Sequence, residues 1–297
     1  MAQQPGTGLT VTSPVLAATF LPDLGMLGAS LRHQGDELLA LPGGLDGYRA
    51  GHVTGLPLLA PWANRLGARR YEVGGVEVDL EGLDLVTDEH GLPIHGTMTA
   101  RPGWQVVARR PGAVEARFDL GAHPDLMASF PFPHELRIAV AVEAATLWVA
   151  TTLVPTGDRA VPVSFGYHPY LRLPGARRPE VRLRMPDRRR IVLDDRGIPT
   201  GAGEAAPAED EPIGDRHFDD HYALDGGDGR FALAAGGRAL TLRMGDGYHY
   251  AQVFTPPGDD CVCLEPMTAP VNALVDGGYA LVQPGDSYGA SFSLEVS

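Results

Sequence analysis

Residues 134–154 read HELRIAVAVEAATLWVATTLV, a run that contains neither glycine nor proline. Its alanines would permit a helix, but large apolar residues recur at every second position from Leu136 to Val142. A period of two places side chains on one face of a β-strand, whereas an amphipathic helix repeats every three to four residues. We therefore predict two antiparallel strands that turn near residues 143–146.

Two-glycine turns continue this pattern. Gly74-Gly75 and Gly236-Gly237 each lie between two strand-like runs, and a pair of glycines is typical of a tight β-hairpin. The flanking runs are residues 70–73 and 76–80 in the first case, and residues 231–234 and 238–244 in the second. Residues 181–185 alternate apolar and basic side chains in the same way. The sequence therefore predicts pairs of antiparallel strands with one face exposed to solvent.

The whole chain fits one all-β unit. It has 297 residues with 38 glycines and 26 prolines, which suits many short strands joined by turns and argues against a helical bundle. No shift in composition divides it, so we expect a single domain over residues 1–297.

Residues 201–211 are interpreted as a surface loop. The best helix candidate is one or two turns near Thr268–Leu274, with Thr268 as cap and Pro270 in the first turn.

The net charge of the chain limits the classes of molecule that it is expected to bind. A formal net charge of −13 disfavours nucleic acid and anionic membranes, which call for a concentrated basic face. The basic cluster Asp187–Arg190 is more typical of a solvated loop or strand end than of an anion site. The amino terminus lacks a signal-like pattern and no long apolar run is present, so we expect a soluble cytoplasmic protein. Its oligomeric state is not predicted.

Cysteine and histidine spacing gives little sign of a metal. Cys261 and Cys263 are two apart in a strand-like run and are expected to be reduced, packed thiols. His217 and His221 are four apart, but in a loop-like acidic stretch rather than on a convincing helix. A cupin-like metalloenzyme is therefore the weakest alternative.

Two proline-locked segments carry the chemistry. Residues 163–170 read VSFGYHPY, and residues 264–267 read LEPM. Their aromatic and apolar flanks predict partial burial of His168 and Glu265. Burial of an ionisable group costs free energy, so buried ionisable groups are often found at functional sites. An imidazole and a carboxylate can donate one proton and accept another at neutral pH. The pair points to an acid–base enzyme.

The order of several motifs resembles the aldose 1-epimerases, the galactose mutarotase family. The resemblance spans residues from about 20 to 290 and is most specific at Tyr167–Tyr170 and Leu264–Pro266. The supporting motifs are Asn64-Arg65, Ile94–Gly96, Asp219 with Tyr222, and Gln252–Thr255.

This resemblance implies a β-supersandwich of antiparallel sheets with the sugar bound in a cleft on a concave face. It implies that His168 is the general acid and Glu265 the general base. The implied substrate-binding residues are Asn64, Arg65, His95, Asp219 and Gln252. No metal and no organic cofactor are implied, and the partner is a small sugar. Trp62 or Tyr170 could cover an apolar face of that sugar.

Two alternatives remain open at this point. Relatives that act on hexose 6-phosphates or sulfonated sugars need additional cations, for which Arg177-Arg178 is a candidate, although an exposed basic turn is the plainer interpretation. The chain could instead be a carbohydrate-binding β-sandwich without catalysis. Such a module needs hydroxyl ligands and stacking aromatics but no acid–base pair, so His168 and Glu265 together favour the enzyme.

Overall fold

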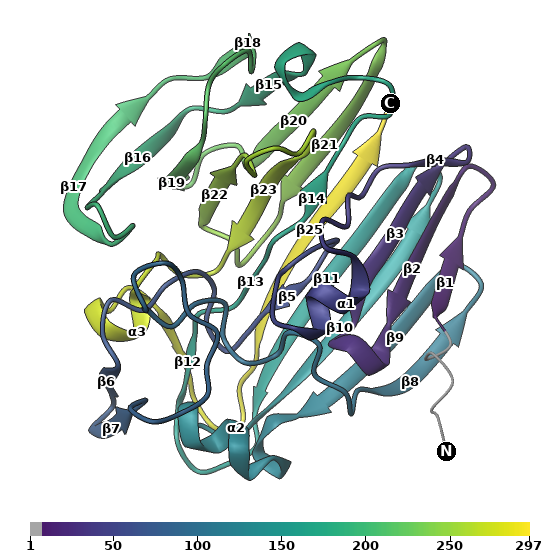
Figure 1. Ribbon diagram of the computed structural model, residues 1–297. Helices are drawn as coiled ribbons and strands as arrows, with labels where there is room; N and C mark the ends of the chain where they lie inside the picture. The colour runs from purple at the N-terminus through teal and green to yellow at the C-terminus, as the bar shows by residue number, and fades with distance from the viewer. Residues whose placement is uncertain (1–7) are drawn as a thin grey trace.

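The computed structural model describes residues 8–297, which form antiparallel sheets in two layers (Figure 1). One layer is a nine-stranded sheet that lies behind the other sheets in Figure 1. In spatial order its strands are β18 (Glu209–Pro212), β15 (Arg182–Met185), β20 (Arg230–Ala235), β21 (Arg238–Met244), β25 (Tyr288–Val296), β11 (Thr146–Pro155), β10 (His134–Glu143), β9 (Ala113–Asp119) and β8 (Gln105–Arg110).

The front layer consists of two sheets. An eight-stranded sheet contains β17 (Pro199–Ala206), β16 (Arg188–Leu193), β19 (Asp219–Ala223), β22 (Tyr250–Phe254), β23 (Val262–Met267), β13 (Gly166–Tyr167) and β5 (Leu58–Leu59), with β14 (Tyr170–Leu171) also paired to β23. A four-stranded sheet contains β1 (Leu9–Thr12), β2 (Leu16–Leu21), β3 (Leu27–His33) and β4 (Asp36–Glu37), and it packs against β9, β10 and β11. This all-β layered architecture confirms the predicted fold class.

The remaining elements are short. Two further strand pairs are β6 (Arg70–Val73) with β7 (Val76–Asp79), and β12 (Val161–Val163) with β24 (Ala280–Val282). The helices are α1 (Gly44–Arg49), α2 (Pro124–Ser129) and α3 (Ala273–Asp276), with 3-10 turns at Pro22–Leu24, Leu120–Ala122 and Arg178–Glu180. No helix within residues 8–297 is long and apolar enough to cross a membrane.

The hairpin predicted from residues 134–154 is confirmed. Strands β10 and β11 pair from His134 with Pro155 to Glu143 with Thr146, so the turn lies at the predicted place. Leu136, Ile138 and Val140 are buried between the layers, while the residues that alternate with them are partly or fully exposed. The two-glycine turns are confirmed in β6–β7 and β20–β21.

The expectation of a surface loop at residues 201–211 is wrong. These residues lie mostly in β17 and β18, which pair with β16 and β15 and extend both layers at one end of the molecule (Figure 1). Their side chains are almost all exposed, so main-chain pairing rather than burial defines the strands. A strand with two exposed faces has no alternating apolar pattern to detect.

The predicted helix at residues 268–274 is only partly correct. The helix α3 begins at Ala273, with Asn272 rather than Thr268 at its amino-terminal cap position. Thr268 is instead buried, and its hydroxyl donates to the Phe165 carbonyl at 2.8 Å. The Thr268 hydroxyl is therefore bound to a neighbouring chain segment and does not cap the helix.

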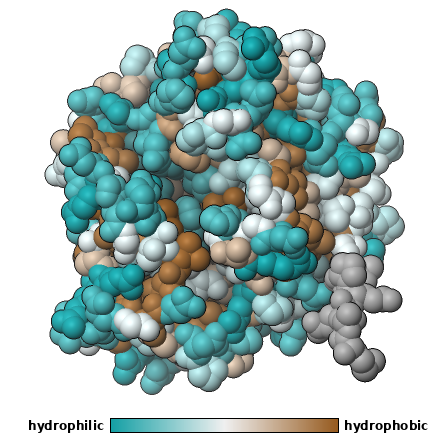
Figure 2. Space-filling model, viewed as in Figure 1, coloured by the Kyte–Doolittle hydropathy of each residue, from teal (hydrophilic) through white to brown (hydrophobic). Residues whose placement is uncertain are grey.

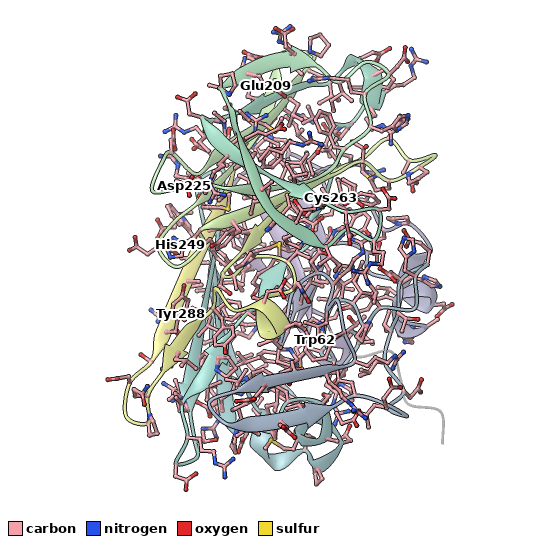
Figure 3. All side chains as sticks on the ribbon, turned by 90° about the vertical axis from the view of Figure 1, so that its left-hand side faces the viewer. Trp62, Glu209, Asp225, His249, Cys263 and Tyr288 are labelled. Carbon is pink, nitrogen blue, oxygen red and sulfur yellow. The ribbon has the colours of Figure 1, made fainter. Side chains whose placement is uncertain are left out.

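Both cysteines are free and buried, as predicted. Figure 3 labels Cys263 and Trp62 within the body of the molecule, whereas Glu209 lies near its top edge. Trp62 has no exposed surface and belongs to the hydrophobic core. The suggestion that Trp62 covers a sugar is therefore wrong, and it is a packing residue.

Residues 80–104 form a long connection between β7 and β8 that contains no helix and no strand of two or more residues. It is fixed to the rest of the protein by isolated bridges, among them Arg65 with Ile94 and Ala60 with Gly96. A Cβ at residue 96 would overlap the Ala60 carbonyl, and the φ angle is +68°, so glycine is needed for this close approach. The contact holds the neighbouring His95 in place.

Candidate active site

All the site residues predicted from the sequence line one cavity of about 220 Å³. Its lining consists of Val53, Asn64, Arg65, Asp88, Glu89, Ile94, His95, His168, Tyr170, Asp219, Gln252, Phe254 and Glu265. The face shown in Figure 2 is hollowed near its middle, and the strands that supply these residues lie around that region in Figure 1. A larger cavity of about 830 Å³ beside α1 and α2 contains none of the predicted residues.

Strand register explains why Gln252 and Glu265 face the cavity together. The two residues are directly paired on β22 and β23, as are Phe254 and Cys263. Side chains on paired residues of adjacent strands point to the same face of a sheet. The intervening pair of Val253 with Leu264 therefore points the opposite way and is buried in the core.

His168 lies beside Glu265 at the centre of the site. It occupies the gap between β13 and β14, and its Nε2 is 3.2 Å from Oε1 of Glu265. The side chains are only 6% and 2% exposed. The imidazole stacks on Tyr170 with ring centroids 4.7 Å apart and an interplanar angle of 11°. This packing fixes the imidazole in one orientation toward the carboxyl group.

Burial perturbs both groups of this pair. It lowers the pKa of His168 to about 3. It raises the pKa of Glu265 well above the usual carboxyl range, and the charge of Asp219 adds to this while that of Arg65 opposes it. Desolvation disfavours the charged form of each group. Both shifts therefore favour a neutral imidazole beside a neutral carboxyl group.

Arg65 is held rigidly at the side of the cavity. Its Nε donates to Asp88 at 2.8 Å, and its Nη2 lies 3.8 Å from Oδ2 of Asp219. Asn64 has a φ angle of +57°, and its Oδ1 accepts hydrogen bonds from the backbone and the guanidinium of Arg65. Asn64 therefore orients Arg65 within the site.

His95 enters from the connection at residues 80–104. Its backbone N–H donates to the Asn64 carbonyl at 3.0 Å, and its ring lies edge-on to His168 with centroids 5.4 Å apart. Burial lowers the pKa of His95 well below its usual value, and His168 and Arg65 add to this effect. A neutral imidazole in this place can donate one hydrogen bond to a ligand and accept another.

Sequence reasoning did not single out Asp88 or Glu89. Asp88 is a carboxylate with a side chain only 2% exposed, and Arg65 is its partner. Glu89 is 72% exposed at the edge of the cavity. An acidic residue in a polar loop carries no sequence signal, because its importance depends on a guanidinium 23 positions away in the chain.

The basic clusters do not form part of the cavity lining. Arg177 pairs with Glu180 at 2.9 Å, and Arg178 donates to the carbonyls of Pro256 and Asp259. The cluster at residues 187–190 lies largely on β16, where Arg189 and Arg190 pair with Asp225 and Asp220. Within residues 8–297, no group of three or more His, Cys, Asp or Glu side chains is arranged to hold a metal ion.

Several solved structures share this fold. The Slr1438 protein from Synechocystis sp. PCC 6803 is 20% identical, with a TM-score of 0.80 over 100% of this chain and 98% of its own. A galactose mutarotase-like protein from Clostridium acetobutylicum is 19% identical, with a TM-score of 0.85 and coverage of 98% and 95%. A galactose 1-epimerase from Lactobacillus acidophilus NCFM is 14% identical, with a TM-score of 0.79 and coverage of 98% and 94%.

At these identities the structures establish a common fold. No protein with a curated description matches the sequence. The family model for aldose 1-epimerase matches residues 23–295, nearly the whole chain. This match covers the strands that carry the cavity and the connection that supplies His95. The chain therefore belongs to the aldose 1-epimerase family.

Proposed function

We propose that the protein is a mutarotase that interconverts the α and β anomers of an uncharged aldose. The observation that carries this proposal is the buried contact of 3.2 Å between His168 and Glu265 in a cavity of polar residues. Anomers exchange when the sugar ring opens and closes again on the other face of C1. This reaction needs one proton acceptor and one proton donor, and the pair supplies both.

The proposed reaction begins with Glu265 as carboxylate and His168 as imidazolium. Glu265 removes the proton of the C1 hydroxyl while His168 protonates the ring oxygen, so the bond between C1 and the ring oxygen breaks. The product is an open aldehyde. After rotation about C1–C2, His168 takes the proton back as the ring closes, and Glu265 returns its proton to the oxygen on C1. Each positioned transfer typically contributes about 10²- to 10⁴-fold.

The resting pair reaches this state without gaining or losing a proton. Moving the shared proton from Glu265 to His168 converts a neutral pair into an ion pair with the same total charge. A bound sugar favours this shift, because its C1 hydroxyl donates to the carboxylate and its ring oxygen accepts from the imidazolium. Substrate hydrogen bonds therefore offset the cost of forming charges in a buried site.

The charge of the cavity favours a neutral sugar over a phosphorylated or sulfonated one. The lining contains the carboxyl groups of Asp88, Glu89, Asp219 and Glu265 but only one guanidinium. That guanidinium, on Arg65, already contacts Asp88 and Asp219. An anionic group would lie near several carboxylates with no unpaired cation to receive it.

The buried pair also favours catalysis over simple binding. His168 Nδ1 and Glu265 Oε2 are buried and have no hydrogen-bond partner among the described residues. Unpaired buried polar atoms destabilise the folded protein. A site that only holds hydroxyl groups has no need of an acid and a base in contact, whereas a proton-transfer site uses both.

The proposal is tested by measuring the rate of anomer equilibration with proton NMR and polarimetry. The substrates are freshly dissolved α-D-glucose, α-D-galactose and a panel of phosphorylated and sulfonated sugars. Faster equilibration of the neutral sugars, lost in Glu265→Gln, is the expected result. Acceleration confined to the anionic sugars would overturn the substrate class. No acceleration across the panel would favour the carbohydrate-binding alternative.

Removal of the side chains proposed to bind the sugar's hydroxyl groups is expected to weaken binding of the transition state. Arg65→Ala and Asp219→Asn should each lower kcat/KM by about 10- to 100-fold, the value of one hydrogen bond to a charged group. Steady-state rates across sugar concentrations give this ratio. Arg190→Ala is a matched control, because it removes an exposed guanidinium paired with Asp220 outside the cavity. An unchanged kcat/KM would remove either residue from the site.

A further inference from the structure

We propose that His221 is a positioning residue that fixes the side-chain amide of Gln252 and, through it, the carboxylate of Asp219. This inference rests on the proposed function, since Asp219 and Gln252 are assigned there to the sugar. His221 has no exposed surface and is not part of the cavity lining. It lies on β19 directly opposite Gln252 on β22, so the two side chains point to the same face.

A backbone hydrogen bond sets the tautomer of His221. The N–H of Val271 donates to His221 Nε2 at 3.2 Å. A ring nitrogen that accepts a hydrogen bond carries no proton, so in the neutral imidazole the proton lies on Nδ1. Burial lowers the pKa of His221 to about 4, and the ring is therefore neutral at pH 7. Parallel stacking on Tyr250, with centroids 5.8 Å apart, limits its rotation.

The Nδ1–H of His221 then needs an acceptor. Nδ1 of His221 and Oε1 of Gln252 are both buried, and neither has a hydrogen-bond partner among the described residues. The Gln252 side chain raises the pKa of His221, in opposition to burial, and the Ala251 backbone adds to this effect. An N–H can be received only by the oxygen of the Gln252 amide, not by its nitrogen.

The proposed hydrogen bond determines which way the Gln252 amide points. With its oxygen toward His221, its nitrogen faces Asp219, and Nε2 donates to Oδ1 of that residue at 2.6 Å. The opposite orientation would place the amide oxygen against a carboxylate oxygen, which is repulsive. Asp219 is thus held by one oxygen, and its Oδ2, 3.8 Å from Arg65, remains for a sugar hydroxyl.

The test compares two substitutions at residue 221. His221→Phe keeps most of the volume but removes the donor, and it is expected to raise KM by about 5- to 10-fold with kcat nearly unchanged, since one neutral hydrogen bond is at stake. In His221→Asn the amide nitrogen replaces Nδ1, and KM should return toward the wild-type value. In a Gln252→Met background, His221→Phe should have no further effect on KM.

His134→Phe is the matched control. His134 is also a buried neutral histidine, with a pKa lowered to about 4 by burial, but it contacts the Phe132 carbonyl outside the cavity. It should change the melting temperature without changing KM. An unchanged KM in His221→Phe, or the same change with and without Gln252, would overturn the proposal.

A readout without turnover separates this inference from the proposed function. Nitrogen-15 NMR of the wild-type protein should show the proton of His221 on Nδ1, and the Gln252 side-chain amide should exchange with water more slowly than in His221→Phe. A proton on Nε2, or equal exchange rates, would overturn the positioning role. If these signals are as expected but no sugar is turned over, the proposed function fails and the structural role of His221 stands.

Discussion

Glu265→Gln is expected to lower kcat for mutarotation by about 10³-fold or more while leaving the fold intact. The amide has nearly the shape of the carboxyl group and can still hydrogen-bond to His168, but it cannot accept the C1 proton. Because burial raises the pKa of Glu265, the carboxyl group gains little from its charge in the folded protein, and a neutral replacement should not reduce stability. Polarimetry gives kcat, and thermal unfolding reports the fold.

The control for this experiment is Glu180→Gln. Glu180 is half exposed and pairs with Arg177 on the surface, so the same chemical change occurs away from the cavity. Wild-type kcat is expected for it. A near-normal rate in Glu265→Gln would contradict the assignment of Glu265 as base, and a collapsed melting curve would show that the carboxyl group serves the fold instead.

His168→Asn is expected to lower kcat by about 10²- to 10³-fold, the contribution of one positioned proton donor. Asparagine retains a hydrogen-bonding amide but does not bind a proton at neutral pH. Glu265 remains as a base without a partner acid, so water must protonate the ring oxygen. The decrease should appear in kcat more than in KM, because the imidazolium contact forms fully only in the transition state.

The pH dependence of the two proteins should have opposite signs. In the active wild-type protein, the pair of His168 and Glu265 holds one titratable proton. Because burial lowers the pKa of His168 to about 3, a second proton binds only near that pH. Because burial raises the pKa of Glu265, the remaining proton is lost only above the usual carboxyl range. Wild-type activity should therefore fall as pH rises through the raised pKa of Glu265. In His168→Asn only the ionised Glu265 is useful, so the residual rate should increase with pH. Rates between about pH 5 and 9 check this, and parallel profiles would contradict the shared proton.

The sequence predicted those parts of the fold in which burial alternates along a strand. In β10 and β11 each second residue meets the opposite layer, so the apolar pattern and the turn at residues 143–146 were both visible. Strands β17 and β18 could not be recognised, because main-chain hydrogen bonds form without regard to side chains. The sequence also could not show that the Thr268 hydroxyl forms a long-range hydrogen bond with Phe165 instead of capping a helix.

For the site, local motifs and the family resemblance predicted a set of sugar-binding residues, and the structure places them around one cavity. What the motifs could not show is how these residues are held. Asp88 and His221 contact partners that are distant in sequence, Arg65 and Val271. Their value comes from tertiary geometry, and an acidic loop residue or a buried histidine looks ordinary in a linear sequence.

The connection at residues 80–104 has an evolutionary consequence. His168 and Glu265 are anchored to the sheet beside β13, β14 and β23, whereas Asp88, Glu89 and His95 belong to a segment without regular structure. Segments of this kind tolerate insertion and replacement more readily than strands do. Replacement of this segment in descendants of the protein would therefore change the cavity lining while leaving His168 and Glu265 in place. Selection would preserve Gly96, because any replacement segment must still approach the Ala60 backbone closely at this position.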